Sequence, residues 1–258
     1  MLMGENIRLA LSRYMENKIK KVFIFDVDGT LTLPRKTIES DFQPIFEEFI
    51  NNHVVFLASG SDFEKIKQQI PIKLIYDCMG VFSCMGNELW VNDHIIYRKK
   101  LNLPPDVVLW LYEQLSNTKY SRHKLGSHNF EYRTGMLNFS IVGRDISQEQ
   151  REDYYQWDLV SGERRAICDK FNDLFRKYEL EACIGGRISI DIQGKGKDKG
   201  QIYDYLSMYD HKTFFGDQCM PGGNDHSLYT KCESKFAVEN YKQTMSILQD
   251  INNGLSNY

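Results

Sequence analysis

The feature that most constrains this chain is an apolar run that ends in two acids. Residues 22–25 read Val-Phe-Ile-Phe, and Asp26 and Asp28 follow with a single valine between them. An apolar run without alternation predicts a parallel strand covered on both faces, and open α/β sheets bind their ligands at the carboxyl ends of such strands. An acidic turn is the alternative, because Asp-Gly is a common turn dipeptide. The length of the motif favours a functional site in an α/β fold.

Two further predicted strands also end in polar side chains. The apolar run at 54–58 is followed by Ser59 and Gly60, and the run at 212–215 is followed by a glycine and Asp217. A hydroxyl and free backbone N–H groups between a strand and a helix suit a phosphate oxygen, although they also suit a simple helix cap. Because parallel strands end at the same edge of a sheet, we expect these residues to lie near the two acids.

The order of predicted elements divides the chain into a core and an insertion. Strands and helices alternate up to residue 93 and again from residue 195, which is typical of an α/β fold. The part between them changes to helices and antiparallel strands, and its residues 188–192 alternate as a half-exposed strand does. We therefore expect a discontinuous core domain, 1–93 with 195–258, and an inserted α+β domain, 94–194.

Two local expectations concern the core domain. Apolar residues four apart predict a short amphipathic helix over residues 6–20. Short apolar runs near 74–76 and 81–83 predict two strands.

Composition narrows the choice of partners and compartment. The net charge of −3 argues against a general nucleic-acid binder, and no apolar run approaches the roughly 20 residues that cross a bilayer. Six cysteines are scattered without a Cys-x-x-Cys pair, and the first residues do not resemble a signal peptide. We therefore expect a cytoplasmic protein with reduced thiols that binds neither a membrane nor nucleic acid.

The polar clusters contain the groups that phosphoryl transfer needs. Asp26 and Asp217 offer the hard oxygen ligands that a magnesium ion prefers. Asp28 faces the same side of an extended chain as Asp26 and could act as general acid and base. Lys199, one predicted helix ahead of the last cluster, could bind phosphate oxygens as a cation, whereas taken alone it would be a solvated linker charge.

These motifs resemble the four motifs of the haloacid dehalogenase superfamily. They comprise Asp26-Val-Asp-Gly-Thr, Ser59, Lys199 and the segment from Gly216-Asp217 to Asn224-Asp225. The resemblance implies a Rossmann-like core with an inserted cap domain. It also implies that Asp26 is phosphorylated, that Asp28 is the acid/base, and that magnesium is held by Asp26, the backbone carbonyl of Asp28 and Asp217.

Longer segments are similar to one family, the eukaryotic-type phosphomannomutases. They run through both predicted domains at residues 31–35, 60–65, 133–138, 143–144, 147–151, 188–191 and 216–225. Carried over to this chain, the family's substrate contacts fall on Arg35, Ser59, Gly60, Arg133, Arg144, Arg151, Ser189 and Asp191. Arginine forks grip phosphate in a bidentate way, and a Ser/Asp pair can hold sugar hydroxyls.

The resemblance implies an activity and its partners. The expected reaction is the interconversion of mannose 6-phosphate and mannose 1-phosphate through an aspartyl-phosphate and a hexose bisphosphate, which supplies GDP-mannose synthesis. The expected cofactors are Mg²⁺ and hexose 1,6-bisphosphate as activator. A homodimer formed through the cap domain is also implied.

Some residues depart from the family pattern, and two other functions stay open. Lys197 replaces a tryptophan, Gln218 replaces a lysine beside the metal-binding Asp217, and Lys231 replaces an aspartate of a second metal loop. The ammonium of Lys231 could stand in for that second cation, so no second metal is predicted. A sugar-phosphate phosphatase would use the same aspartyl-phosphate with water as acceptor. An inactive scaffold would be expected to have lost one of the acids or Lys199, and all are present.

Overall fold

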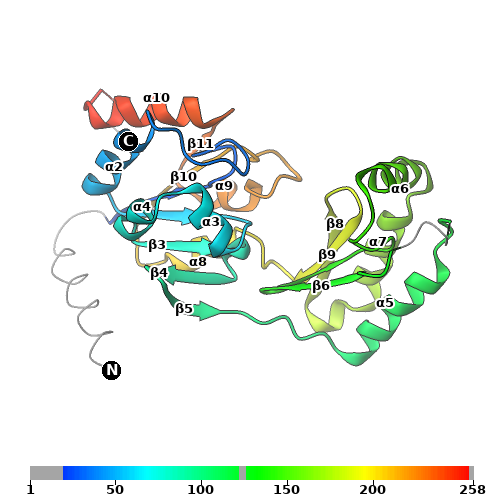
Figure 1. Ribbon diagram of the computed structural model, residues 1–258. Coiled ribbons are helices and arrows are strands. Elements are labelled where there is room, and N and C mark those ends of the chain that lie inside the picture. The colour runs from blue at the N-terminus through cyan, green and yellow to red at the C-terminus, as the bar shows by residue number, and fades with distance from the viewer. Residues whose placement is uncertain (1–19, 122–125, 256–258) are drawn as a thin grey trace. The chain divides into compact units, whose positions relative to one another are not determined.

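A computed structural model describes residues 20–121 and 126–255, and the chain divides into two compact units (Figure 1). Met1–Tyr97 with Asp198–Tyr258 form the first unit, and Arg98–Lys197 form the second. The predicted insertion at 94–194 begins ahead of β5 (His94–Arg98), but β5 belongs to the sheet of the first unit, so the boundary lies at the end of this strand. The helix expected over 6–20 lies outside the described residues except for its last residue.

The sheet of the first unit confirms the predicted α/β fold. Its seven strands have the order β11-β10-β1-β2-β3-β4-β5, and β1 lies inside the sheet between β10 and β2, parallel to both. The pairs β1/β10, β1/β2, β10/β11 and β2/β3 are parallel, whereas β4 is antiparallel to β3. The bounds are β1 (Lys21–Phe25), β2 (Val55–Ala58), β3 (Gly80–Ser83), β4 (Glu88–Val91), β10 (His211–Gly216) and β11 (Ser234–Ala237).

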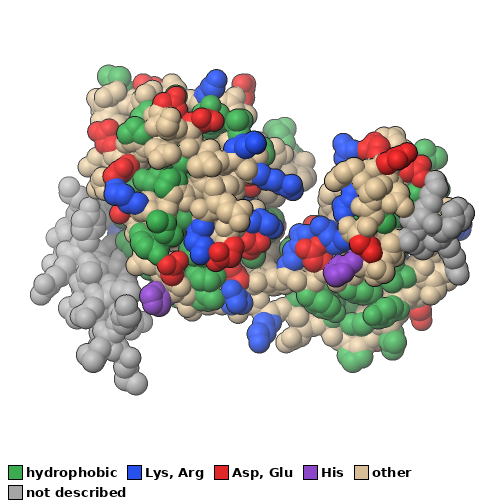
Figure 2. Space-filling model, viewed as in Figure 1, with side chains coloured by type: hydrophobic (Ala, Val, Ile, Leu, Met, Phe, Trp, Pro, Cys, Tyr) green, Lys and Arg blue, Asp and Glu red, His purple; other side chains and the backbone are tan. Residues whose placement is uncertain are grey.

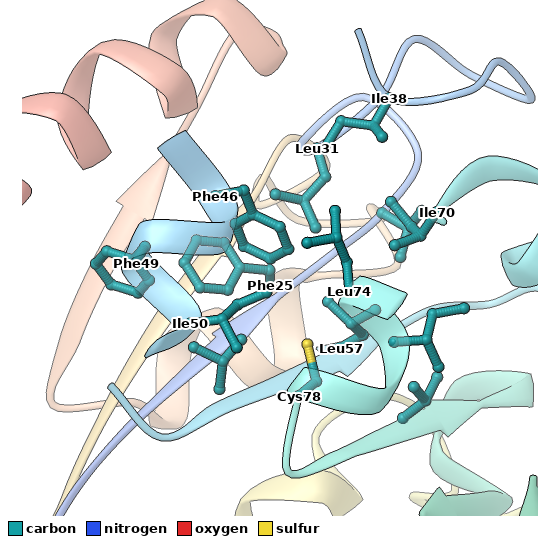
Figure 3. Packing of buried hydrophobic residues seen from close by; sticks show 14 of the residues in the cluster. Phe25, Leu31, Ile38, Phe46, Phe49, Ile50, Leu57, Ile70, Leu74 and Cys78 are labelled. Atoms are coloured by element: carbon teal, nitrogen blue, oxygen red, sulfur yellow. The ribbon is translucent and has the colours of Figure 1, made fainter. Parts of the chain in front are cut away.

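Side chains of β1 alternate between two apolar clusters, which is why this strand shows no polar alternation. Phe23 and Phe25 belong to an apolar cluster with residues of helices α2, α4 and α10, and Figure 3 shows Phe25 beside Phe46 and Phe49 of α2. Val22 and Ile24 pack against α8 and α9 on the other face. The helices are α2 (Gln43–Asn52), α3 (Phe63–Gln69), α4 (Ile72–Asp77), α8 (Gln201–Tyr205), α9 (His226–Lys231) and α10 (Tyr241–Asn252), with a 3-10 turn η1 (Cys84–Gly86).

One predicted strand of the first unit is wrong. Residues 74–76 lie within helix α4, where Leu74 and Ile75 are both buried. A short apolar run does not distinguish a strand from a buried helix. Pro71 at the N-cap carries no N–H group to lose, so it favours a helix start here. The predicted strand near 81–83 is confirmed as part of β3.

The second unit is an α+β body with its own core. Its four-stranded antiparallel sheet has the order β6-β7-β9-β8. The strands are β6 (Phe130–Arg133), β7 (Met136–Phe139), β8 (Leu180–Gly185) and β9 (Ser189–Gly194); the helices are α5 (Pro105–Asn117), α6 (Gln148–Ser161), α7 (Glu163–Leu174) and the 3-10 turn η3 (Arg176–Tyr178). Ile190 and Ile192 of β9 point into the apolar core, so the period of two places Ser189 and Asp191 on the opposite side of the strand. Among the described helices of both units, none combines the length and the apolarity needed to span a bilayer.

Candidate active site

A buried charge cluster lies at the carboxyl ends of β1 and β10. Lys199, which is fully buried, donates from Nζ to Asp26 and, at 2.6 Å, to Oδ1 of Asp225. Asp26, Asp217 and Asp225 each offer a carboxylate oxygen, and these oxygens lie within 4.8 Å of one another. The structure thus brings together three of the residues predicted for the core site and adds Asp225, which the sequence places in the motif but does not single out.

Burial sets the electrostatics of this cluster. It raises the pKa of Asp26 to about 7, with the Lys199 charge opposing the rise and the charges of Asp225 and Asp217 adding to it. Burial also raises the pKa of Asp217. Burial alone would lower the pKa of Lys199, but the charges of Asp26 and Asp225 raise it above its usual value, so the ammonium stays protonated at neutral pH. One cation among three carboxylates leaves the ionised cluster negative, which favours a bound cation.

The oxygens of this cluster fit a magnesium ion, which prefers hard oxygen ligands. Both oxygens of Asp225 already accept hydrogen bonds, one from Lys199 and one at 3.0 Å from the backbone N–H of Gln218. Asp26 and Asp217 are therefore the carboxylates better suited to the ion. Gly29 allows their approach, because its φ is +88° and a Cβ there would lie 2.3 Å from Oδ2 of Asp217.

Asp28 lies apart from the three clustered carboxylates, held by two donors on one oxygen. Its Oδ1 accepts from the backbone N–H of Arg35 at 2.7 Å and from Nε2 of Gln69 at 2.8 Å. Gln69 also donates to the hydroxyl of Thr32 at 3.2 Å and is buried. Both of these hydrogen bonds fall on Oδ1 and neither on Oδ2. Gln69 was missed by the sequence prediction, although a glutamine on the inner face of α3, three residues after Ile66, is a detectable signal.

The end of β2 meets the loop that carries Asp225. Ser59 is buried and its Oγ accepts the backbone N–H of Ser61 at 3.0 Å. A Cβ at Gly60 would lie 3.7 Å from Nδ2 of Asn224, the residue before Asp225. Ser59 and Gly60 therefore lie at the same sheet edge as the charge cluster. Arg35 is also in the first unit, exposed and with φ +61°.

The other predicted substrate contacts gather in a pocket of the second unit. The pocket has a volume of about 320 Å³. Five of its lining residues are those predicted from the sequence: Arg133, Arg144, Arg151, Ser189 and Asp191. Six others were not predicted: Asn138, Gln148, Gly185, Gly186, Arg187 and Ile188. Figure 2 shows basic and acidic side chains close together over the strands of this unit.

Hydrogen bonds organise the pocket around Asn138. Its Oδ1 accepts from Arg144, and its Nδ2 donates to Oδ1 of Asp191. Glu131 pairs with both Arg144 and Arg133, and Arg133 meets its two oxygens at 3.1 Å each.

Charge in this pocket favours an anion. Burial lowers the pKa of Arg144, and the neighbouring charges of Arg133 and Arg151 lower it further, although Glu131 opposes them. Burial raises the pKa of Asp191, whereas the hydrogen bond from Asn138 and the charges of Arg133 and Arg144 lower it. A bound phosphate would relieve the repulsion between the guanidinium groups.

Two departures from the family pattern have clear contacts. Gln218 donates from Nε2 to Oδ2 of Asp217 at 2.9 Å, so it supports the carboxylate without adding a charge. Lys231 donates to the carbonyl of Gly200 at 3.0 Å and pairs with Asp204 at 3.4 Å. The Lys231 ammonium thus binds oxygens at the N-cap of α8 and within that helix.

Solved structures of low sequence identity share this fold. The chain matches the IMP-nucleotidase of Plasmodium falciparum with a TM-score of 0.61 and 14% identity, over 90% of this chain and 69% of that one. It matches a trehalose-6-phosphate phosphatase of Aspergillus fumigatus with a TM-score of 0.57 and 15% identity, over 92% and 93%. These similarities confirm the predicted Rossmann-like haloacid dehalogenase fold and concern the fold alone.

Sequence comparisons identify the family. Residues 42–253 match the model of eukaryotic phosphomannomutases. A phosphomannomutase of Dendrobium officinale is 32% identical over 216 residues, which cover 81% of this chain and 84% of that protein. Phosphomannomutase 2 of Dictyostelium discoideum is 30% identical over 252 residues, which cover 92% and 98%. This chain belongs to the eukaryotic phosphomannomutase family.

Proposed function

We propose that the protein is a magnesium-dependent phosphomannomutase that interconverts mannose 6-phosphate and mannose 1-phosphate. The observation that carries the proposal is the pocket of Arg133, Arg144 and Arg151, which is additional to the charge cluster around Asp26. A mutase must bind one phosphate while it transfers another, so it needs two anion sites. A hydrolase for a simple ester needs only one.

In the proposed mechanism Asp26 carries the phosphoryl group. A carboxylate oxygen of Asp26 forms a bond to phosphorus of hexose 1,6-bisphosphate, the ester P–O bond breaks, and Asp28 gives a proton to the sugar oxygen that leaves. The sequence then runs in reverse on a hexose monophosphate, whose free hydroxyl gives a proton to Asp28 and takes the phosphoryl group from Asp26. The resulting bisphosphate must turn around before its other phosphate reaches Asp26.

The residues of the charge cluster have separate roles in this proposal. Asp26, Asp217 and the backbone carbonyl of Asp28 would hold Mg²⁺, which supplies charge neutralisation for the phosphate oxygens. Lys199 opposes the burial that raises the pKa of Asp26 and orients its carboxylate, and Asp225 fixes Lys199 in turn. In the second unit the arginines bind the phosphate that is not transferred, and Ser189 with Asp191 binds sugar hydroxyls.

A sugar-phosphate phosphatase is the second candidate, and one observation favours it. Gln218 occupies the position beside Asp217 where the family usually has a lysine, so one positive charge near the reacting phosphate is missing. In this alternative, water attacks the aspartyl-phosphate in place of a sugar hydroxyl. The arginine pocket favours the mutase. An inactive scaffold is disfavoured because Lys199 is fully buried against Asp26 and Asp225. Desolvation of these charges costs folding free energy, which a chain without catalysis has no reason to retain.

The distribution of products tests the proposal. The protein is incubated with mannose 1-phosphate, magnesium and a trace of hexose 1,6-bisphosphate, and ³¹P NMR follows mannose 6-phosphate and free phosphate together. We expect mannose 6-phosphate to be the main product, at a rate that depends on the bisphosphate. Free phosphate as the main product would overturn the mutase in favour of the phosphatase, and no turnover of any sugar phosphate would favour the scaffold.

Three finer parts of the proposal concern the setting of the reaction. The product would supply GDP-mannose synthesis in the cytoplasm, in keeping with six cysteines that form no disulfide. A homodimer would form through the second unit, where Leu109 and Tyr112 on α5 are 65% and 55% exposed. Light scattering on the full chain tests the dimer, which Leu109→Asp should dissociate.

A further inference from the structure

An arginine is buried inside the second unit, away from the pocket surface. Arg164, in the first turn of α7, is 2% exposed, and Asp158, near the end of α6, is 6% exposed. Arg164 begins a buried stripe that continues with Ile167, Cys168 and Phe171, so it occupies a position that an apolar side chain would normally fill. A buried ion pair is weak support for stability, because desolvation offsets its attraction. The reason for a buried arginine at this position therefore has to be sought in the hydrogen bonds that Arg164 makes.

The guanidinium of Arg164 joins Asp158 to one turn of the sheet. Its Nε donates to Oδ2 of Asp158 at 2.8 Å, and its backbone N–H donates to Oδ1 at 2.9 Å. Its Nη1 donates to the carbonyls of Gly186 at 2.9 Å, Ser189 at 3.1 Å and Gly185 at 3.4 Å. Gly186 lies in the turn between β8 and β9, and Gly185 and Ser189 are the strand residues that flank it. Asp158 thus orients a planar donor that binds the backbone of that turn.

The same turn forms one wall of the arginine pocket. Residues 185–189 all line it, and the Ser189 hydroxyl donates to the carbonyl of Gly185 at 2.7 Å. A Cβ at Gly185 would lie 2.5 Å from the carboxylate of Asp191. The backbone held by Arg164 is therefore in close contact with Asp191, which is predicted to bind sugar hydroxyls. A shift of this turn would move Ser189 and Asp191 together.

We infer that Arg164, oriented by Asp158, is a positioning residue for substrate binding in the second unit. It fixes the turn without itself lining the pocket, so it is not expected to touch the substrate. The inference rests on the proposed function for the identity of the substrate. A lysine cannot reproduce the planar, forked contacts, although it keeps the charge and most of the volume.

The test uses Arg164→Lys and, as matched control, Arg165→Lys at the exposed neighbouring position. Steady-state kinetics are measured with mannose 1-phosphate and with para-nitrophenyl phosphate, an ester that has no second phosphate group to reach the pocket. We expect Arg164→Lys to raise KM for mannose 1-phosphate by about tenfold, the loss typical of one hydrogen bond to a charged group. Hydrolysis of the aryl ester should stay within about twofold of wild type, and the control should change neither reaction.

Calorimetric titration with inorganic phosphate separates this inference from the proposed function. Because Asp191 is linked through Asn138 to Arg144, a shift of the turn also moves a predicted phosphate ligand. The binding component that disappears in Arg151→Ala should therefore weaken by about tenfold in Arg164→Lys, whatever reaction the enzyme catalyses. If no hexose phosphate is turned over but this component weakens, the proposed function fails and the assignment of Arg164 holds. A folded Arg164→Lys with wild-type KM and wild-type phosphate affinity, or with equal losses on both esters, would overturn the assignment.

Discussion

Replacing Lys199 by methionine should strongly destabilise the first unit at neutral pH. Lys199 is fully buried, and its ammonium binds the carboxylates of Asp26 and Asp225. Methionine keeps the apolar stem but leaves two buried acids without their cation. Removing one partner of a buried ion pair costs about 3–5 kcal/mol. We expect a loss of this size in the free energy of unfolding at about pH 7.5 without magnesium.

The loss should become smaller at lower pH. Burial raises the pKa of Asp26 to about 7 even with Lys199 present, and the pKa should rise further without that cation. A raised pKa in the folded state means that the folded chain holds the proton more tightly than the unfolded chain. Its stabilising contribution is complete below the unfolded pKa of 3.8 and is lost as pH rises through about 7. At about pH 5 the variant therefore recovers part of the loss, because Asp26 is then neutral.

Urea denaturation at the two pH values measures both effects. Trp90 is in the first unit, so its emission follows this unit when Trp110 and Trp157 of the second unit are replaced by phenylalanine in every chain compared. Lys242→Met, at an exposed position of α10, is the control and should cost less than about 1 kcal/mol. A Lys199→Met loss as small as the control, or one that grows on acidification, would refute the assignment of Lys199 as the buried counter-ion.

Three further predictions concern the arginine pocket, the support of Asp28 and the binding of magnesium. Arg151→Ala should lower kcat/KM for mannose 1-phosphate by about tenfold or more while aryl phosphate hydrolysis changes little, and equal losses would contradict the second phosphate site. Gln69→Leu should lower kcat for phosphoryl transfer by about 10–100-fold with little change in KM, because Asp28 loses one of the donors on Oδ1; an unchanged kcat would contradict this role. Magnesium affinity, measured by calorimetry, should rise with pH up to about 7 as Asp26 loses its proton, and a pH-independent affinity would exclude Asp26 as a ligand.

The ends of parallel strands made the core site predictable. Asp26, Ser59 and Asp217 each follow an apolar run, and the rule that such strands end at one edge brings them together. The predicted substrate residues of the second unit came from resemblance, because no periodicity distinguishes Arg151 from a surface arginine. The alternation of side chains along β9 does predict that Ser189 faces away from the core, because its neighbour Ile190 enters the core.

Two of the residues that the sequence did not reveal lie at inward-facing helix positions. Gln69 lies on the inner face of α3 with Ile66, and Arg164 lies on the inner face of α7 with Ile167. A polar side chain on an apolar stripe signals a buried partner, but the partner is set by tertiary contact, 41 residues away for Gln69 and Asp28. Helix α4 was misassigned because its apolar run is too short to show a period.

The fate of the phosphate on Asp26 tests the central claim most directly. The enzyme is labelled with a ³²P-labelled hexose 1,6-bisphosphate, freed of excess label and mixed with mannose 1-phosphate; Asp26→Asn, which should take up no label, is the control. We predict that the label passes to a hexose bisphosphate and then to mannose 6-phosphate faster than it is released as free phosphate. Release as free phosphate at the same rate with and without the sugar would contradict the account.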